Sequence, residues 1–108
     1  MQTIQGITTN QIQELEVELE TGENFIMNLE FFENQGIGYW TINVKYKNII
    51  TGAKKITICN NILEDEKNLL PFGLIARSQN SLDPYFLNDF SSGRVLIILL
   101  NETEKNSL

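Results

Sequence analysis

Residues 39–47 read Tyr-Trp-Thr-Ile-Asn-Val-Lys-Tyr-Lys, and this stretch decides the fold. Its large apolar side chains alternate with polar ones, a period of two that is typical of a β-strand with one buried face. The buried face would carry Trp40, Ile42, Val44 and Tyr46, and the outer face Thr41, Asn43, Lys45 and Lys47. An aromatic and basic platform for nucleic acid is the other interpretation, but Trp40 and Tyr46 share the apolar face, which favours core packing.

Two more strands are predicted on the N-terminal side, joined to each other by a turn at residues 21–24. Residues 25–32 alternate with the same period, and Phe25, Met27, Leu29 and Phe31 share one face. Residues 12–20 fit either a helix, with apolar positions three to four apart, or a strand, with apolar positions alternating with glutamates. The strand is favoured because it places four glutamates on one solvent-facing side: Glu14, Glu16, Glu18 and Glu20.

The C-terminal half is predicted to add strands at residues 54–59, 72–78 and 94–101, the last a continuous apolar run that indicates burial on both faces. Residues 60–71 would form a short helical turn or an irregular loop, and residues 79–92 are rich in turn signals. The predicted fold class is all-β: a small antiparallel β-barrel or sandwich of about six to seven strands, with little helix. Residues 1–108 would form a single domain, with a β core at 11–101 and polar termini at 1–10 and 102–108, the latter frayed.

The composition excludes several kinds of chemistry. The chain has 108 residues, with 8 Lys and Arg against 14 Asp and Glu, no His, one Cys and a formal net charge of −6. Zinc fingers and the Ser-His-Asp and Cys-His arrangements are excluded, and the acidic balance argues against direct contact with nucleic acid. The lone Cys59, in an apolar alternation, is predicted to be a small buried hydrophobic residue.

The sequence also bears on the compartment. Residues 1–10 lack both the basic and the apolar region of a secretory signal. The longest apolar run, residues 95–100, is far shorter than the roughly 20 residues of a membrane-spanning helix. We therefore expect a soluble protein made in a reducing cytosol, without membrane contact.

No motif marks a catalytic, metal or cofactor site. The acidic run Glu64, Asp65 and Glu66 lacks the spacing of a calcium loop, and Gly36 and Gly38 lack the lysine and helix of a phosphate-binding loop. Without His, no acid–base pair stands out by its spacing. The chain is predicted not to be an enzyme and to need no metal or cofactor. One candidate site remains, a solvated face or a face for a basic partner, which we call the glutamate ladder: Glu14, Glu16, Glu18 and Glu20.

One order of features runs through residues 13–100. It consists of an aromatic-containing strand at 39–44, a tight turn at 51–52, the pair Leu69 and Leu70, a strand at 73–76, the turn Asp83 and Pro84, and an apolar strand at 95–100. This order resembles that of the small baseplate plug proteins of contractile-tailed phages, of the type found in cyanophages.

The resemblance implies a structural protein of the tail tip that packs near the tail axis against hub, spike and tube proteins. Copies would surround the axis, most simply as a trimer, without catalysis or direct contact with nucleic acid. The location would be the tail baseplate of the virion, after assembly in the host cytoplasm. The alternatives are another tail subunit (tube, adaptor or wedge) and a small-molecule or carbohydrate-binding β-barrel.

Overall fold

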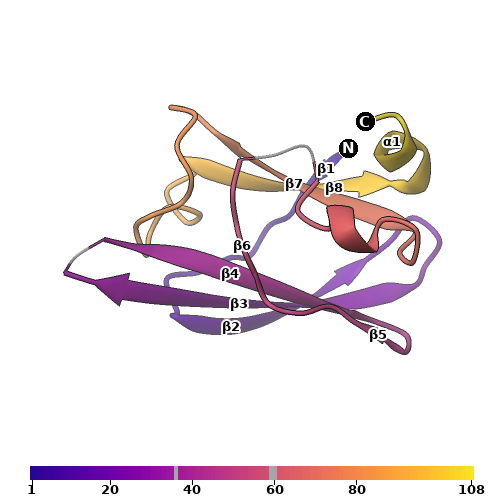
Figure 1. Ribbon diagram of the computed structural model, residues 1–108, viewed down its shortest axis with the longest axis horizontal. Helices are drawn as coiled ribbons and strands as arrows, with labels where there is room; N and C mark the ends of the chain where they lie inside the picture. Colours follow the sequence, from indigo (N-terminus) through magenta and orange to yellow (C-terminus); the bar gives the residue numbers. More distant parts are fainter. Residues whose placement is uncertain (36, 59–60) are drawn as a thin grey trace.

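Two antiparallel β-sheets face each other in the computed structural model, which describes residues 1–35, 37–58 and 61–108 (Figure 1). The larger sheet has the order β2-β3-β4-β5, with β6 also paired to β4, and comprises β2 (Ile12–Glu18), β3 (Asn24–Asn34), β4 (Ile37–Tyr46), β5 (Ile49–Ile50) and β6 (Lys54–Lys55). The smaller sheet has the order β1-β8-β7 and comprises β1 (Gln2–Thr3), β7 (Phe72–Ser78) and β8 (Val95–Asn101). The short helices are η1 (Glu64–Glu66) and α1 (Glu102–Asn106). The all-β class is confirmed, and two separate sheets make it a sandwich.

The alternation in the sequence sets the buried face of the larger sheet. The apolar residues predicted to face inward from β3 and β4 are all buried, and Met27 lies opposite Val44 in the register. The side chain of Trp40 is fully enclosed, with 0% exposed. The strand interpretation of residues 12–20 is also confirmed, because β2 pairs with β3 along its whole length and alternates in exposure.

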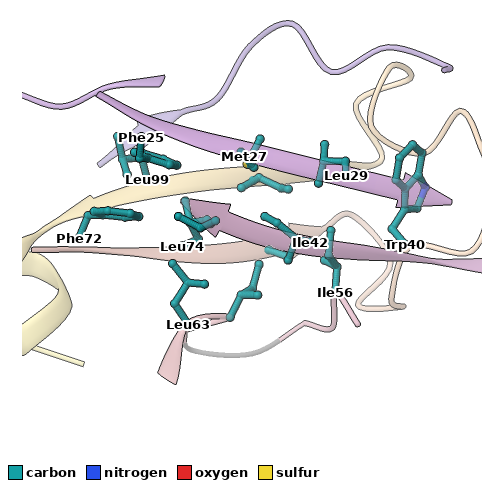
Figure 2. Close-up of a cluster of buried hydrophobic side chains, with 14 of the residues drawn as sticks. Phe25, Met27, Leu29, Trp40, Ile42, Ile56, Leu63, Phe72, Leu74 and Leu99 are labelled. Atoms are coloured by element: carbon teal, nitrogen blue, oxygen red, sulfur yellow. The ribbon is translucent and has the colours of Figure 1, made fainter. Parts of the chain in front are cut away.

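Aromatic side chains join the two sheets in the interior (Figure 2). The ring of Phe25 on β3 stacks on that of Phe72 on β7 with centroids 4.2 Å apart, and Tyr46 of β4 meets Phe72 edge-on at 5.8 Å. Trp40 makes an edge-to-face pair at 5.2 Å with Phe90, from the loop that precedes β8. Such pairs add specific geometry to the burial of apolar area, so the loop before β8 is held by the same core as the strands.

Strand β8 is buried on both faces, as its continuous apolar run predicts. Its odd-numbered residues from 95 to 99 join the main core, whereas Ile98 and Leu100 form a second buried cluster with Ile75. Leu96 is the exception, with 40% of its surface exposed. Apolar side chains of the smaller sheet are therefore buried on its outer face as well as on the face toward the larger sheet.

The two termini are ordered parts of the fold, which corrects the prediction that residues 102–108 are frayed. At the N-terminus β1 pairs with β8, and Gln2 lies opposite Leu99. At the C-terminus a reciprocal cap starts α1: Asn101 Oδ1 accepts from the Glu104 N–H at 2.8 Å, and the Glu104 carboxylate accepts from the Asn101 N–H at 3.0 Å. This capping box satisfies backbone donors that would otherwise need water, and the polar composition of residues 102–108 concealed it.

Lys105 fixes α1 to the body of the protein. Its side chain is buried, which is unusual for a lysine. Its Nζ donates to the backbone carbonyls of Lys67 at 2.5 Å and Leu70 at 2.6 Å. Its stem passes over Gly73 of β7, where an added Cβ would lie 3.2 Å from Lys105 Cγ. The same added Cβ would lie 3.2 Å from Asn61 Oδ1, so a larger residue at position 73 would require both side chains to shift by a few tenths of an ångström.

We expect Lys105→Met to lower the free energy of unfolding by about 1–3 kcal/mol, because the stem still packs while two carbonyls lose their donor. Lys67→Met is the matched control, since Lys67 Nζ pairs with Glu64 at the surface at 2.9 Å. The control should change stability by less than about 0.5 kcal/mol. Urea unfolding of both variants measures the difference, and equal losses would contradict the anchoring role of Lys105.

The segment after β4 differs from the strand predicted at residues 54–59. In the described part of this segment, the strands that pair with β4 are β5 and β6, of two residues each. Between them Thr51 binds β4 differently: its N–H donates to the Val44 carbonyl and its hydroxyl accepts from the Val44 N–H, both at 2.9 Å. A side chain thus replaces a backbone group in the ladder, which hydrophobic periodicity cannot reveal. The prediction for Cys59 lies outside the described residues.

The loops agree with the prediction. Residues 64–66 form η1, which confirms a helical turn between residues 60 and 71. Residues 79–92 consist of turns, bends and irregular backbone. Within the described ranges, no helix has the length and apolar character needed to cross a membrane.

Candidate functional site

The glutamate ladder lies on β2 and on the turn that follows it. Glu14, Glu16 and Glu18 are exposed on the outer face of the larger sheet, as the strand prediction requires. Glu20 is also exposed but lies beyond the end of β2, where it lines a pocket of about 550 Å³ beside β8 and α1. The structure therefore brings three of the four glutamates together on one strand and separates the fourth.

Strand β2 is an edge strand whose outer side has no neighbouring strand among the described residues. Two hydrogen bonds just beyond its ends show which alternate residues of β2 bond to β3. Phe31 N–H donates to the Gln11 carbonyl at 2.8 Å, and Leu19 N–H donates to the Glu23 carbonyl at 2.7 Å. In an antiparallel pair, only every second residue bonds to a given neighbour. The odd-numbered residues of β2 therefore bond to β3, and the outward N–H and C=O groups belong to Ile12, Glu14, Glu16 and Glu18.

The other sheet edges in the described part of the chain are short or partly covered. Strands β1, β5 and β6 have 2 residues each. Strand β7 is longer, but Asn61 Oδ1 accepts from its Leu74 N–H at 3.1 Å, and Ile62 N–H donates to the Leu74 carbonyl at 2.7 Å. Strand β2 is thus the long open edge of this structure. Such edges bind other chains unless charge or cover prevents it.

The negative charge on β2 is not compensated by a neighbouring cation. No ion pair involves the glutamates of β2 in the described residues, and Glu16 accepts only a hydrogen bond from the Asn24 amide, at 2.6 Å. In the same row of the sheet Lys45 lies two strands away, beyond Ile26. Two strand spacings amount to about 10 Å, roughly the screening length in physiological salt. The edge therefore presents an acidic surface.

Glu23, in the turn after β2, shows the opposite situation. Lys47 Nζ lies 2.7 Å from one carboxylate oxygen, and the Tyr46 hydroxyl donates to the other at 2.9 Å. The bond from Lys47, followed by that from Tyr46, lowers the pKa of Glu23, and the bond to Glu23 raises the pKa of Lys47. The chain thus neutralises this acid itself, whereas it leaves the β2 glutamates to solvent or to a partner.

A shallow groove on the same outer face was not predicted. Its volume is about 520 Å³, and its polar lining includes Glu14, Asn28, Glu30, Thr41 and Asn43. In the next row of the sheet the rings of Phe32 and Tyr39 stack with centroids 5.2 Å apart, and Phe32 is 41% exposed. The alternation predicts polar side chains on this face, but the hollow depends on side-chain sizes in three paired strands.

Asp89 is a buried acid, 2% exposed, that sequence reasoning did not single out. Its Oδ2 accepts from the N–H groups of Tyr85 and Phe86 at 2.6 and 2.7 Å and from Arg94 Nη2 at 2.6 Å. Burial by itself would raise the pKa of Asp89, but the hydrogen bonds from Arg94, Phe86 and Tyr85 outweigh it and lower that pKa. The carboxylate is fully engaged by the chain, so its role is structural.

Arg94 extends this network across the loop before β8. It donates to the Asn80 side chain at 2.7 Å and to the carbonyls of Leu82 and Asp83 at 3.2 and 3.1 Å. Its guanidinium also lies over the Tyr85 ring, 4.4 Å from the centroid. One ion pair therefore orders a loop that the sequence shows only as a series of turn signals.

The acidic run at η1 is likewise used within the chain. Lys54 Nζ lies 2.9 Å from a Glu66 oxygen and 3.2 Å from an Asp65 oxygen. Burial works to lower the pKa of Lys54, but the bonds to Glu66 and Asp65 outweigh it, so the pKa is raised. In the ranges that the structure describes, no three or more His, Cys, Asp or Glu side chains are grouped to hold a metal ion.

The sequence matches no protein-family model, and no curated protein matches it significantly. The geometry of the chain itself therefore selects the candidate site. That site is the open acidic edge of β2 together with the outer face of the larger sheet beside it.

Proposed function

We propose that this chain is a structural component of a phage tail baseplate, a plug or hub-associated protein that packs near the tail axis and stabilises the tail tip. One observation carries the assembly role: β2 is a seven-residue edge strand, and three of its four outward-facing residues are glutamates. An open edge of this length invites pairing with another chain. The resemblance of the order of sequence features to that of baseplate plug proteins supports a phage baseplate as this assembly.

The partners of such a subunit would be hub, spike and tube proteins and further copies of the chain, most simply three around the tail axis. Its work would be mechanical, and the aromatic contacts that join the two sheets suit a subunit that has only to pack and hold. It would act without a cofactor, without direct contact with nucleic acid and without a membrane, in the virion after assembly in the host cytoplasm. Another tail subunit, such as a tube, adaptor or wedge protein, would differ in copy number.

We expect the purified chain, at tens of micromolar, to self-associate or to form a complex with a co-expressed hub protein. Size-exclusion chromatography with light scattering measures both, and the copy number in assembled tails separates a plug from a tube or wedge subunit. A chain that stays monomeric and leaves the hub protein unbound would contradict the proposal. Tail-tube, tape-measure and spike-like genes beside this gene would support it, and metabolic genes would argue against it.

The groove on the outer face favours a second candidate, the binding of a small polyol or sugar. Amide and carboxylate side chains suit hydroxyl groups, and the stacked pair of Phe32 and Tyr39 offers an apolar platform beside them. This role predicts a monomer whose Asn28, Asn43 and Tyr39 signals shift when oligosaccharides are titrated in an NMR experiment. Unchanged signals at millimolar sugar would exclude it.

A further inference from the structure

On the premise of the assembly role proposed above, we infer that the β2 edge receives an extended segment of a different protein. Lysine or arginine occupies alternate positions of that segment, with apolar residues between them. The inference follows from three observations: which backbone groups of β2 point outward, which of its side chains are exposed, and that the chain's own alternating basic segment is already paired within the larger sheet.

The backbone of β2 fixes where the segment pairs. The outward N–H and C=O groups of Ile12, Glu14, Glu16 and Glu18 are spaced two residues apart, as one side of a β-ladder requires. A strand of 7 residues extends about 23 Å at 3.3 Å per residue. A partner segment of the same length can therefore satisfy every outward group along β2.

The side chains of β2 fix the composition of the segment. Residues directly opposite each other on paired strands carry their side chains on the same face of the sheet. The positions opposite Glu14, Glu16 and Glu18 therefore lie on the acidic outer face and favour lysine or arginine. The positions between them lie on the inner side, beside Leu15 and Val17, which are half-buried and pack against the main core. Apolar residues there extend that core.

A second copy of this chain is a poor occupant of the edge. When β2 pairs antiparallel with the β2 of a second copy through its outward groups, even-numbered residues oppose even-numbered residues, and glutamates face glutamates. In a parallel pair even-numbered residues would oppose odd-numbered ones, and glutamates would face the apolar Leu15 and Val17. The chain's own alternating basic segment, Lys45 to Lys47, is not available either, because Lys45 pairs with Ile26 of β3 on one side and Ile50 of β5 on the other. Copies of the chain must therefore associate through other surfaces, and the β2 edge is left for a different protein.

Three synthetic peptides test the inference with the full chain. The first alternates lysine with valine over seven residues, the second has the same composition with the lysines grouped together, and the third alternates glutamate with valine. We expect the alternating basic peptide to bind at least tenfold more tightly than the other two. Its binding should weaken at high salt, because exposed charges make the cross-strand contacts. Hydrogen exchange should slow at the outward amides of β2, at positions 12, 14, 16 and 18, and not at the odd-numbered ones.

Three variants separate strand pairing from general attraction between charges. Glu16→Lys should weaken the basic peptide at least tenfold and improve binding of the acidic one. Glu16→Pro removes one outward N–H without touching the bonds to β3, a change that edge strands tolerate, and should also weaken binding. Glu30→Lys is the matched control, since Glu30 lies on the same face but on β3, one strand in from the edge, and should change affinity less than twofold.

The outcomes are distinguishable from those of the assembly role. Equal effects of Glu16→Lys and Glu30→Lys, or equal binding of the alternating and grouped peptides, overturn strand pairing in favour of diffuse attraction. Slow exchange of the outward amides at high protein concentration without peptide identifies a second copy as the occupant and overturns the inference. Failure of every peptide to bind overturns it too, while a complex with a hub protein still supports the baseplate role.

Discussion

Trp40→Ala should lower the free energy of unfolding by about 3–5 kcal/mol, as deletion of a large buried aromatic side chain does. Trp40 is fully buried and touches two other aromatic rings, those of Phe31 at 5.3 Å and Phe90 at 5.2 Å. Its Nε1 also donates to the Phe86 carbonyl at 3.1 Å. The variant therefore loses apolar burial, ring contacts and a bond to the loop before β8 at once.

Trp40→Phe serves as the control, because it keeps an aromatic ring in the site and removes the hydrogen bond to the loop. It should cost about 1–3 kcal/mol. Urea unfolding at neutral pH gives both values. A loss below about 1 kcal/mol for Trp40→Ala would mean that the side chain does not support the core, and a role for the aromatic residues in surface binding would return.

Asp89→Ala should cost a similar amount, about 3–5 kcal/mol, because it leaves a largely buried guanidinium without its counter-charge. Two backbone N–H groups, those of Tyr85 and Phe86, also lose their acceptor. The control is Asp65→Ala, which breaks an ion pair of Lys54 whose acid is 86% exposed and should cost less than about 1 kcal/mol. Chemical denaturation of the two variants makes the comparison, and similar losses would contradict a structural role for Asp89.

The Asp89 carboxylate also makes the free energy of unfolding fall at acid pH. The pKa of Asp89 in the folded chain lies below its ordinary value, so its contribution is complete above the unfolded-state pKa of about 3.9. The contribution falls as the pH drops below that value and through the lower folded-state pKa. Urea midpoints measured between about pH 5 and pH 2 should decline less steeply for Asp89→Asn than for the unmodified chain, and parallel curves would assign the acid sensitivity to other groups.

The main strands could be predicted because a strand with one buried face carries apolar residues at every second position. Residues 39–47 are the clearest case, and the paired strand β3 follows the same rule. The same reasoning placed the glutamates of β2 on one exposed face. What the alternation cannot state is which strand lies at the edge of a sheet, since that depends on pairing between distant segments. The open backbone of β2 was for that reason beyond sequence reasoning.

The features that sequence reasoning missed depend on single side-chain contacts that no periodicity marks. Helix α1 is held in place by the hydrogen bonds from Lys105 to the carbonyls of Lys67 and Leu70, more than thirty positions earlier in the chain. The loop before β8 rests on Asp89 and Arg94, which are close in sequence but are not distinguished by any periodicity. The groove on the outer face likewise requires three strands to be in register. Polar residues that bond to particular partners leave no repeating signal.

The pairing of β1 with β8 determines when the chain can finish folding. Gln2 lies opposite Leu99, so the two strands cannot meet until residue 99 has left the ribosome. The hairpins that join β2, β3 and β4 are local and can close within microseconds, whereas contacts so distant in sequence carry a larger entropic cost of loop closure and form slowly. We expect β1 to dock last. Until it does, one side of β8 is open in the nascent protein.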